Sequence, residues 1–359
     1  MSFELGRTIG GYEFVDILKS SRNGVLYRVR NVAKRRFEML RVLSDKLQED
    51  PVRVERLLRE GKILSRMSHP HIVTFYSAET LEGQLVLTTE VLEGSTLAQR
   101  AALGPIPWPE AVGYLSQTLS ALGYAHAQGI VHREIAPSAI LVTPEGSVKL
   151  TSFGMAKTPT DPRLTVAGTV LGSLYYMSPE QVKGTAALDG RSDIYSTGVT
   201  LYKILTGRVP FDRESQFDVM LAHVADAAVP PSAAHPGVPP EFDAVILKAM
   251  AKDPAERFQT AQEFAASLDE IKLTLEGNVA GPARSNGIIP LSAPPPGTPS
   301  PIPPLPSSGT PMPVASAVPQ WRVHPWRSPQ VIAQVMLAAA GLFLVAVFAV
   351  LTILNHGHR

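Results

Sequence analysis

The sequence predicts an α+β fold with two lobes, because strand-like and helix-like patterns occupy different stretches of the chain. Short runs of β-branched and aromatic residues dominate up to about Leu92, and amphipathic helical patterns dominate after it. One early stretch, residues 50–67, instead repeats apolar side chains near helical spacing after Asp50 and Pro51, residue types that begin helices. We therefore expect a β-rich N-terminal lobe that carries one helix, followed by a helical C-terminal lobe.

The composition excludes several classes of function. The 359 residues are 45% hydrophobic, which is ample for a sizeable core. Lys and Arg number 33 against 32 Asp and Glu, so no global field favours nucleic acid, and we expect no nucleic-acid partner. The absence of cysteine excludes disulfides, thiol catalysis and cysteine metal sites, and it fits a domain in a reducing cytoplasm.

A proline-rich stretch follows the globular pattern. Residues 282–329 hold 15 prolines, with Ser, Gly, Ala and Thr between them, a composition that cannot bury a core and favours extended polyproline II. We interpret residues 275–329 as a flexible linker. The alternative is a docking function, because residues 301–306 contain overlapping PxxP spacings that fit an aromatic groove.

An apolar run near the C-terminus predicts a transmembrane helix at residues 330–354. Its 24 residues from 331 to 354 carry no charge, and as a helix they would span ~36 Å. The alternative, a buried core helix, rarely runs so long without a charged residue. Trp321, Arg322, Trp326 and Arg327 precede the run as an aromatic and positive flank, which places the globular part on the cytoplasmic side of the cell membrane.

The two ends of the chain complete this organisation. Residues 1–4 hold an acidic side chain and no apolar run, so they do not resemble a cleaved signal peptide. Residues 355–359 are expected to form a short extracytoplasmic tail. The small residues 338–341 form no clean GxxxG pattern, and the oligomeric state is left open.

Five segments carry motifs in a fixed order. They are residues 132–141 (HREIAPSAIL), 152–154 (SFG), 172–180 (GSLYYMSPE), 192–198 (SDIYSTG) and 253–258 (DPAERF). In order and spacing they resemble the bacterial Hanks-type Ser/Thr protein kinases, whose catalytic loop reads HRDIKPxNIL and whose metal-binding motif reads DFG. The resemblance implies a bilobal protein-kinase fold over residues 12–274, after an N-terminal tail at residues 1–11.

The resemblance also shows where phosphate-facing positions depart from the family. The glycine-rich loop falls on residues 19–26, where only the third glycine, Gly24, remains, and an ordinary β-hairpin is the better interpretation. The strand lysine falls on Arg41 and its acidic partner on Glu60, which favours a structural salt bridge over a phosphate clamp. Met39 stands where a small alanine packs on adenine, and it would fill the nucleotide pocket.

The catalytic loop and the metal motif depart further. Glu134 replaces the catalytic aspartate, which moves the carboxylate by about one methylene, and a misplacement near 1 Å costs on the order of 100-fold. Ala136 replaces the lysine that steadies the phosphoryl group, and Ala139 replaces a metal-holding asparagine. Ser152 replaces the DFG aspartate, and a neutral hydroxyl is a weak Mg²⁺ ligand. Leu141, which ends the catalytic-loop motif, completes the candidate nucleotide-binding positions.

These replacements predict a pseudokinase. Because the chemistry is lost and the scaffold motifs are kept, we expect no metal site and a membrane-anchored signalling scaffold or regulator that binds a protein partner, either an active kinase or a client. The alternatives are an active Ser/Thr kinase that uses ATP and Mg²⁺ in a non-standard site, and a platform whose proline-rich linker does the recognition.

Arg133 also keeps its family position, where an arginine can grip a phosphorylated activation segment. Four nearby threonines are candidates for phosphorylation by a second kinase, or they simply populate a polar loop; these are Thr158, Thr160, Thr165 and Thr169.

Overall fold

The structure, a computed structural model, describes residues 3–21, 24–44, 48–155, 174–185 and 188–279. The proline-rich stretch, the predicted transmembrane helix at 330–354 and the four candidate threonines lie outside these residues. Among the described helices none is long and apolar enough to cross a membrane. The compact unit that contains the described residues spans residues 1–286.

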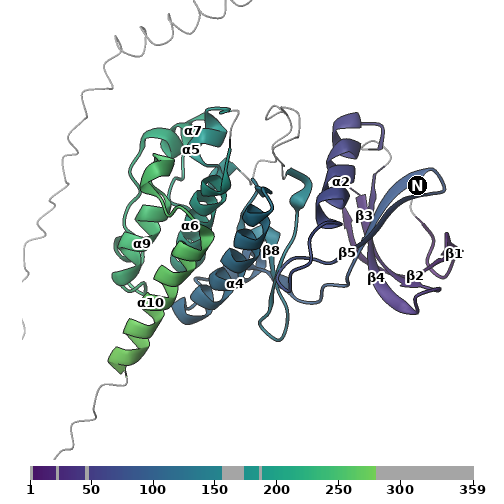
Figure 1. The fold of residues 1–359 in the computed structure, drawn as a ribbon, viewed down its shortest axis with the longest axis horizontal. Coiled ribbons are helices and arrows are strands. Elements are labelled where there is room, and N and C mark those ends of the chain that lie inside the picture. The colour runs from purple at the N-terminus through teal and green to yellow at the C-terminus, as the bar shows by residue number, and fades with distance from the viewer. Residues whose placement is uncertain (1–2, 22–23, 45–47, 156–173, 186–187, 280–359) are drawn as a thin grey trace, which may run out of the picture. The chain divides into compact units, whose positions relative to one another are not determined.

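The N-terminal lobe is an antiparallel sheet with one helix packed beside it (Figure 1). Its strand order is β1-β2-β3-β4-β6-β5, and β2 shifts register twice along its pairing with β3. The strands are β1 (Thr8–Ile9), β2 (Tyr12–Ser21), β3 (Gly24–Asn31), β4 (Arg36–Leu43), β5 (Phe75–Leu81) and β6 (Gln84–Thr89). This arrangement confirms the predicted β-rich first lobe.

The helix of this lobe, α2 (Pro51–Leu64), begins where the sequence predicts. The Asp50 side chain accepts a hydrogen bond from the Val52 backbone N–H at 3.0 Å, and Pro51 occupies the first turn, where no N–H is needed. The buried face of the helix includes Leu57, Glu60 and Leu64. The charged residue Glu60 therefore lies on the inner side of α2, where it forms a salt bridge with Arg41 of β4.

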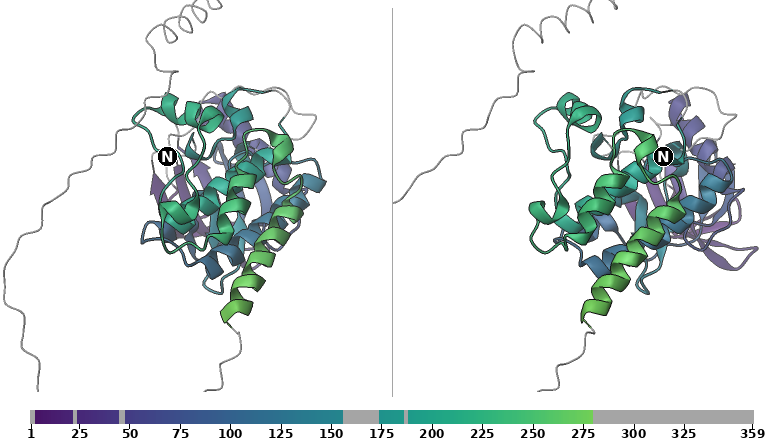
Figure 2. Two further views of the ribbon diagram at one scale, coloured as in Figure 1. Left: turned by 90° about the vertical axis from the view of Figure 1, so that its left-hand side faces the viewer. Right: turned by 60° about the vertical axis from the view of Figure 1, so that its left-hand side comes forward.

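The C-terminal lobe is helical, with a small second sheet at the junction of the two lobes (Figures 1 and 2). Figure 2 shows α10 lying across the outside of this lobe. The second sheet has the order β7 (Ser95–Thr96), β8 (Ile140–Val142), β9 (Val148–Leu150). The helices are α3 (Leu97–Ala101), α4 (Trp108–Ala127), α5 (Pro179–Val182), α6 (Gly190–Thr206), α7 (Gln216–Ala225), α8 (Pro231–Ala234), α9 (Glu241–Ala249) and α10 (Ala261–Val279), with 3-10 turns η1 (Pro137–Ala139), η2 (Phe153–Met155), η3 (Leu174–Tyr176) and η4 (Pro254–Glu256).

Two separate hydrophobic cores support the lobes. The first joins the end of α2 to α4, α6, α9 and α10, and it includes Phe153 of the SFG motif. The second lies in the N-terminal sheet and contains Tyr12, Phe14, Tyr27 and neighbouring aliphatic residues. Helix α6 is buried along almost its whole length, starts at the Asp189 cap and ends at Gly207 in the left-handed region.

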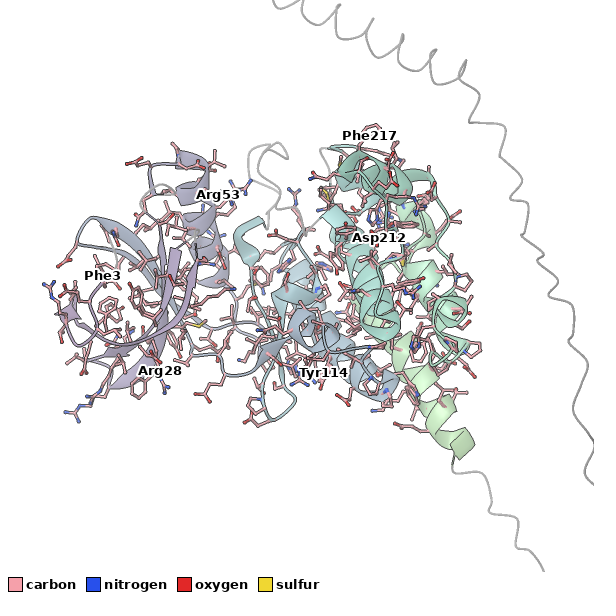
Figure 3. The ribbon with its side chains drawn as sticks, turned by 180° about the vertical axis from the view of Figure 1, so that it is seen from behind. Phe3, Arg28, Arg53, Tyr114, Asp212 and Phe217 are labelled. Atoms are coloured by element: carbon pink, nitrogen blue, oxygen red, sulfur yellow. The ribbon has the colours of Figure 1, made fainter. Side chains whose placement is uncertain are left out.

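The fold extends beyond the predicted limits of 12 and 274 on both sides. Phe3 and Ile9, which the sequence analysis places in a tail, are buried in the N-terminal core, where Phe3 lies 4.7 Å from the Phe14 ring (Figure 3). At the other end, α10 continues to Val279, past the predicted start of the linker. A two-residue strand and an aromatic contact give no periodic signal, so the sequence pattern does not reveal them.

Candidate functional site

A charged pair links the two walls of the candidate nucleotide cleft. Arg41 on β4 donates from Nη2 to Oε2 of Glu60 on α2, as the sequence predicts. The Glu60 side chain is 9% exposed, and its carboxylate lies against Gly154, where an added Cβ would be 3.4 Å from Oε2. The pair therefore holds α2 against the sheet and the SFG motif together.

Met39 and Leu141 lie on strands that border the cleft. Met39 shares the face of β4 that carries Arg41, is half-buried, and pairs across the sheet with Thr89 of β6 and Arg28 of β3. Leu141 is half-buried on β8, between Thr96 and Lys149.

Gly24 serves the sheet. It pairs with Ser21 in the β2–β3 hairpin and with Leu43 of β4, and its φ is 136°. A Cβ there would lie 2.0 Å from the backbone oxygen of Val42, so the close approach of two strands alone requires glycine at this position. The structure thus supports the hairpin interpretation of this stretch.

The catalytic loop is held by a buried carboxylate. Asp193 at the start of α6 accepts hydrogen bonds from the backbone N–H groups of His132, at 2.8 Å, and Arg133, at 2.7 Å. Its Oδ2 also contacts Nε2 of His126 at 2.8 Å. Burial alone would raise the pKa of Asp193, but the bonds from His126 and the backbone reverse this and hold the pKa below its ordinary value. The carboxylate therefore stays charged and anchors the loop.

His132 fixes the loop to the SFG motif. Its Nε2 lies 2.8 Å from the Thr151 carbonyl oxygen, its Nδ1 accepts from the Glu134 backbone N–H at 3.2 Å, and its ring packs on Phe153 at 4.5 Å. This pattern assigns the proton to Nε2 of a neutral ring. Complete burial lowers the pKa of His132 and agrees with that assignment.

Ala139 and Ser152, which stand where the family has its metal ligands, lie close together. Thr151, which precedes Ser152, donates from its backbone N–H and its hydroxyl to the Ala139 carbonyl oxygen, at 2.9 and 3.1 Å. Ala139, at the asparagine position, is 3% exposed, and Ala136, at the lysine position, is 5% exposed. A buried methyl group therefore stands at each of these two positions. Ser152 keeps a φ of 69° and Arg133 a φ of 68°, so both backbone turns are left-handed although neither residue is glycine.

Glu134 sits in a partly buried setting beside α2. Burial is the main cause that raises its pKa above the ordinary value; Arg56 and Arg53 on α2 act to lower it, and Glu60 acts to raise it further. The structure therefore brings Glu134, Ser152, Ala139, Arg41 and Glu60 into one region. Gly24 belongs instead to the end of the sheet.

Two residues that the sequence analysis did not single out also support the loop. The Gln181 side-chain amide donates to the Arg133 carbonyl oxygen at 2.7 Å, and His126 contacts Asp193 as described above. His126 lies in the last turn of α4, only six residues before His132, and this proximity was the available signal. Glu180 and Arg257 form a buried ion pair at 2.8 Å behind them.

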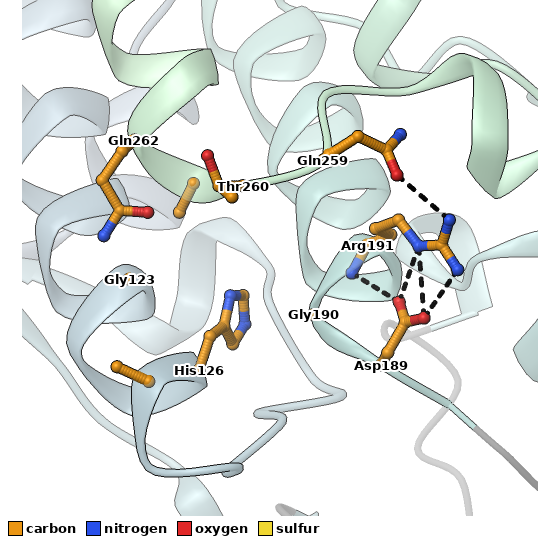
Figure 4. Close-up of a pocket in the computed structure, with 10 residues that line it drawn as sticks. Gly123, His126, Asp189, Gly190, Arg191, Gln259, Thr260 and Gln262 are labelled. Carbon is orange, nitrogen blue, oxygen red and sulfur yellow. Dashed lines mark hydrogen bonds and ion pairs between the residues drawn. The ribbon is translucent and has the colours of Figure 1, made fainter.

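A pocket of about 420 Å³ lies in the C-terminal lobe and contains none of the predicted site residues (Figure 4). Gln262, His126 and the ion pair of Asp189 with Arg191 line it. Gly123 and Gly190 border it in tight packing, since a Cβ at Gly123 would lie 2.2 Å from the Gln262 amide nitrogen. We interpret it as a packing seam between α4, α6 and α10.

Comparisons with known proteins agree with this geometry. Residues 12–267 match the protein kinase domain family, and the chain belongs to that family. PknB of Mycobacterium leprae, a serine/threonine-protein kinase, is 37% identical over 263 residues, which cover 72% of this chain and 42% of PknB. PknE of Mycobacterium tuberculosis is 34% identical over 330 residues, which cover 89% of this chain and 58% of PknE.

A solved structure shows the same fold. The crystal structure of the Mycobacterium tuberculosis PknI kinase domain matches with a TM-score of 0.59 at 28% identity and covers 75% of this chain and 99% of that domain. The chain spans between 39% and 58% of the length of PknB, PknE and a probable serine/threonine-protein kinase of Clostridium perfringens. The matched part of this chain is therefore a serine/threonine-kinase-like domain, and the corresponding domain of PknI was solved by itself.

Proposed function

We propose that this protein is a pseudokinase: a membrane-anchored member of the Ser/Thr kinase family that transfers no phosphate and acts as a signalling scaffold or regulator by binding a protein. One observation carries the proposal. The two neighbouring positions where the family holds its metal ions contain a buried methyl group, at Ala139, and a neutral hydroxyl, at Ser152.

The residues present do not fit Mg²⁺ and the phosphates of ATP. Magnesium prefers charged oxygen ligands, and the nearby carboxylate of Glu60 is engaged by Arg41. The other nearby carboxylate, Glu134, is partly buried, and this burial raises its pKa above the ordinary value. Among the described residues no group of three His, Asp or Glu side chains is arranged to hold a metal ion.

Two lysines of the family are also replaced: Ala136 removes a positive charge, and Arg41 keeps the charge on a broader group that pairs with Glu60. A lost group of this kind removes about 3 kcal/mol of transition-state stabilisation in typical enzymes, and several losses together remove most of a rate enhancement. The rigid scaffold, by contrast, is fully bonded around Asp193 and His132. A well-ordered lobe with an inert cleft supports binding as the function, with an active kinase or a client as the partner.

The membrane part of the proposal rests on the sequence. The charge-free run within residues 330–354 and its flank of Trp and Arg support a single span of the cell membrane with the kinase-like domain in the cytoplasm. Carbonate extraction of the full chain tests this directly: the chain should stay in the membrane pellet, and a chain lacking residues 330–354 should be released.

The second candidate is an active kinase with a non-standard site. It is favoured by the intact salt bridge of Arg41 with Glu60 and by the kinase names of the relatives. In that mechanism Glu134 would accept the proton of the substrate hydroxyl. Replacement of Glu134 by alanine separates the two candidates, because phosphotransfer that depends on Glu134 contradicts the pseudokinase proposal.

The sharper experiment restores the family residues in residues 1–286. The variant combines Arg41→Lys, Glu134→Asp, Ala136→Lys, Ala139→Asn and Ser152→Asp. With ATP and Mg²⁺ at about 100 times the dissociation constant, binding raises the free energy of unfolding by about 2.7 kcal/mol. We expect a rise in melting temperature for the restored variant and none for the natural sequence.

Two outcomes would overturn the proposal. A magnesium-dependent rise in the melting temperature of the natural sequence would show that a metal–nucleotide site exists. Phosphate transfer by the natural sequence that the Glu134→Ala variant lacks would show catalysis. The linker alternative has its own test: a chain lacking residues 282–329 should still capture the partner if the kinase-like domain is the binding surface.

A further inference from the structure

One hairpin of this nearly neutral chain carries a run of cations without acidic residues. Residues 28–37 read RVRNVAKRRF, with five Lys or Arg side chains and no Asp or Glu. They form the end of β3, the turn, and the start of β4. We call the exposed side chains of this hairpin, Val32, Lys34, Arg35 and Phe37, together with the half-buried Arg28, the hairpin surface.

The hairpin surface combines charge with exposed apolar groups. Val32 is 51% exposed and Phe37 is 45% exposed, although residues of these types normally pack inward on a sheet. The Arg28 guanidinium lies over the Phe37 ring at 4.5 Å. The surface thus combines a cation stacked on an exposed ring with an exposed aliphatic side chain. Such a combination suits an interface that is apolar inside and anionic at its surface.

The acidic groups around the hairpin leave a positive excess. Glu13 pairs with Arg30 at 3.6 Å, and the buried Glu38 pairs with Arg36 at 2.8 Å. Asp16 is the cross-strand neighbour of Arg28. Lys34 and Arg35, at the exposed tip, form no ion pair with an acidic residue of the described chain.

We propose that the hairpin surface docks on the anionic headgroups of the membrane, and that Val32 and Phe37 enter the interfacial layer. The inference rests on the proposed membrane anchor. Arg28 lies at the lower margin of the sheet in Figure 3, and the C-terminal end of α10 points to the same side of the molecule (Figures 1 and 3).

The length of the predicted linker explains why a second contact with the membrane would matter. About fifty residues separate α10 from the predicted anchor, and a flexible chain of that length has an end-to-end distance of ~40 Å. Such a tether fixes the distance of the domain from the membrane only loosely and leaves its orientation free. Docking of the hairpin surface would fix the orientation and present the C-terminal lobe to partners.

Vesicle sedimentation of residues 1–286 tests the contact without the anchor. This segment is one compact unit that contains both cores, and the solved PknI domain shows that the matched region folds alone. We expect binding to phosphatidylcholine vesicles that contain about 30% phosphatidylserine, and weak binding to pure phosphatidylcholine. The double variant Lys34→Gln with Arg35→Asn should lower the partition coefficient about 25-fold, since each cation contributes about fivefold.

A matched variant controls for overall charge. Lys62 and Arg66 are exposed and lie on and just after α2, outside the hairpin surface. The double variant Lys62→Gln with Arg66→Gln removes the same charge and should leave binding within twofold of the natural segment. An equal loss in both double variants, or equal binding to neutral vesicles, or no binding at all, would overturn the proposal.

A fluorescence measurement reports insertion. The segment contains one tryptophan, Trp108, so Phe37→Trp adds a second at the hairpin surface. Brominated lipids should quench the Phe37→Trp variant on vesicle binding and leave the natural segment unquenched. The segment lacks residues 330–354, so an absence of vesicle binding would overturn the docking of the hairpin surface and leave the anchor proposal intact. Release of the full chain by carbonate would overturn the anchor proposal and leave the vesicle-binding result intact.

Discussion

The residues that support the catalytic loop from behind keep their bonds, whereas the residues that face the cleft are replaced. Behind the loop, Asp193, His132 and Arg257 each make several hydrogen bonds to backbone and side-chain partners. In front of it, Ala139 and Ser152 offer a methyl group and a hydroxyl where charged or amide ligands belong in the family. The comparison teaches that the loop geometry depends on the support behind it and not on the groups that would touch phosphate.

Breaking the support should have the largest effect. Arg257 is 2% exposed and bonds both carboxylate oxygens of Glu180, at 2.8 and 2.9 Å. Arg257→Ala leaves a partly buried carboxylate without its partner, and we expect a loss of about 3–5 kcal/mol in the free energy of unfolding of residues 1–286, measured with urea. Burial alone would raise the pKa of Glu180, but the bonds from Arg257 and Ser192 hold it below the ordinary value.

The exposed ion pair nearby supplies the control. Arg191 bonds Asp189 at 2.8 Å on the surface, and Arg191→Ala should cost at most about 1 kcal/mol. Equal losses for the two variants would contradict the assignment of Arg257 as a main support of the lobe.

A second variant probes the end of the N-terminal sheet, where Gly24 lies apart from the catalytic loop. Gly24→Ala places a Cβ 2.0 Å from the Val42 oxygen at a φ of 136°, and we expect a loss of at least about 2 kcal/mol. Gly83→Ala is the matched control, because Gly83 also has a positive φ but an added Cβ meets nothing within 4 Å. If Gly24→Ala were as mild as Gly83→Ala, the glycine would not be required by strand packing.

The smallest effect concerns Glu134. Because its folded pKa is raised, the unfolded chain releases this proton at lower pH, and ionisation destabilises the fold as the pH rises above 4.5. Glu134→Gln should therefore raise the melting temperature by about 2 °C at pH 7. The same variant should give a smaller gain at pH 4, where most of the carboxyl groups are protonated in both states. A gain that persists unchanged at pH 4 would mean that charge is not the cause.

The sequence predicted the fold and the charged pair well for definite physical reasons. The kinase motifs lie at fixed spacing, and the resemblance to the family places Arg41 at the strand-lysine position and Glu60 at its acidic partner. The contact of Gly24 with Val42 was not predictable, since the close approach of two backbones leaves no mark on residue spacing. Gln181 and His126 were missed because they act through backbone and carboxylate bonds that only the folded chain brings together.

The division of the molecule into two hydrophobic cores has a consequence for its motions. The C-terminal end of α2, with Ile63 and Leu64, packs into the large core, whereas the sheet has a core of its own. Amide hydrogen exchange should therefore release the sheet as one cooperative unit while the end of α2 stays protected with the other lobe. Arg41 and Glu60 join these two units, and Gly61 of α2 lies against Phe75 and Leu87 of the sheet beside that pair. We therefore expect the sheet to exchange as a unit of its own while this charged pair and the packing around it keep the sheet tied to α2.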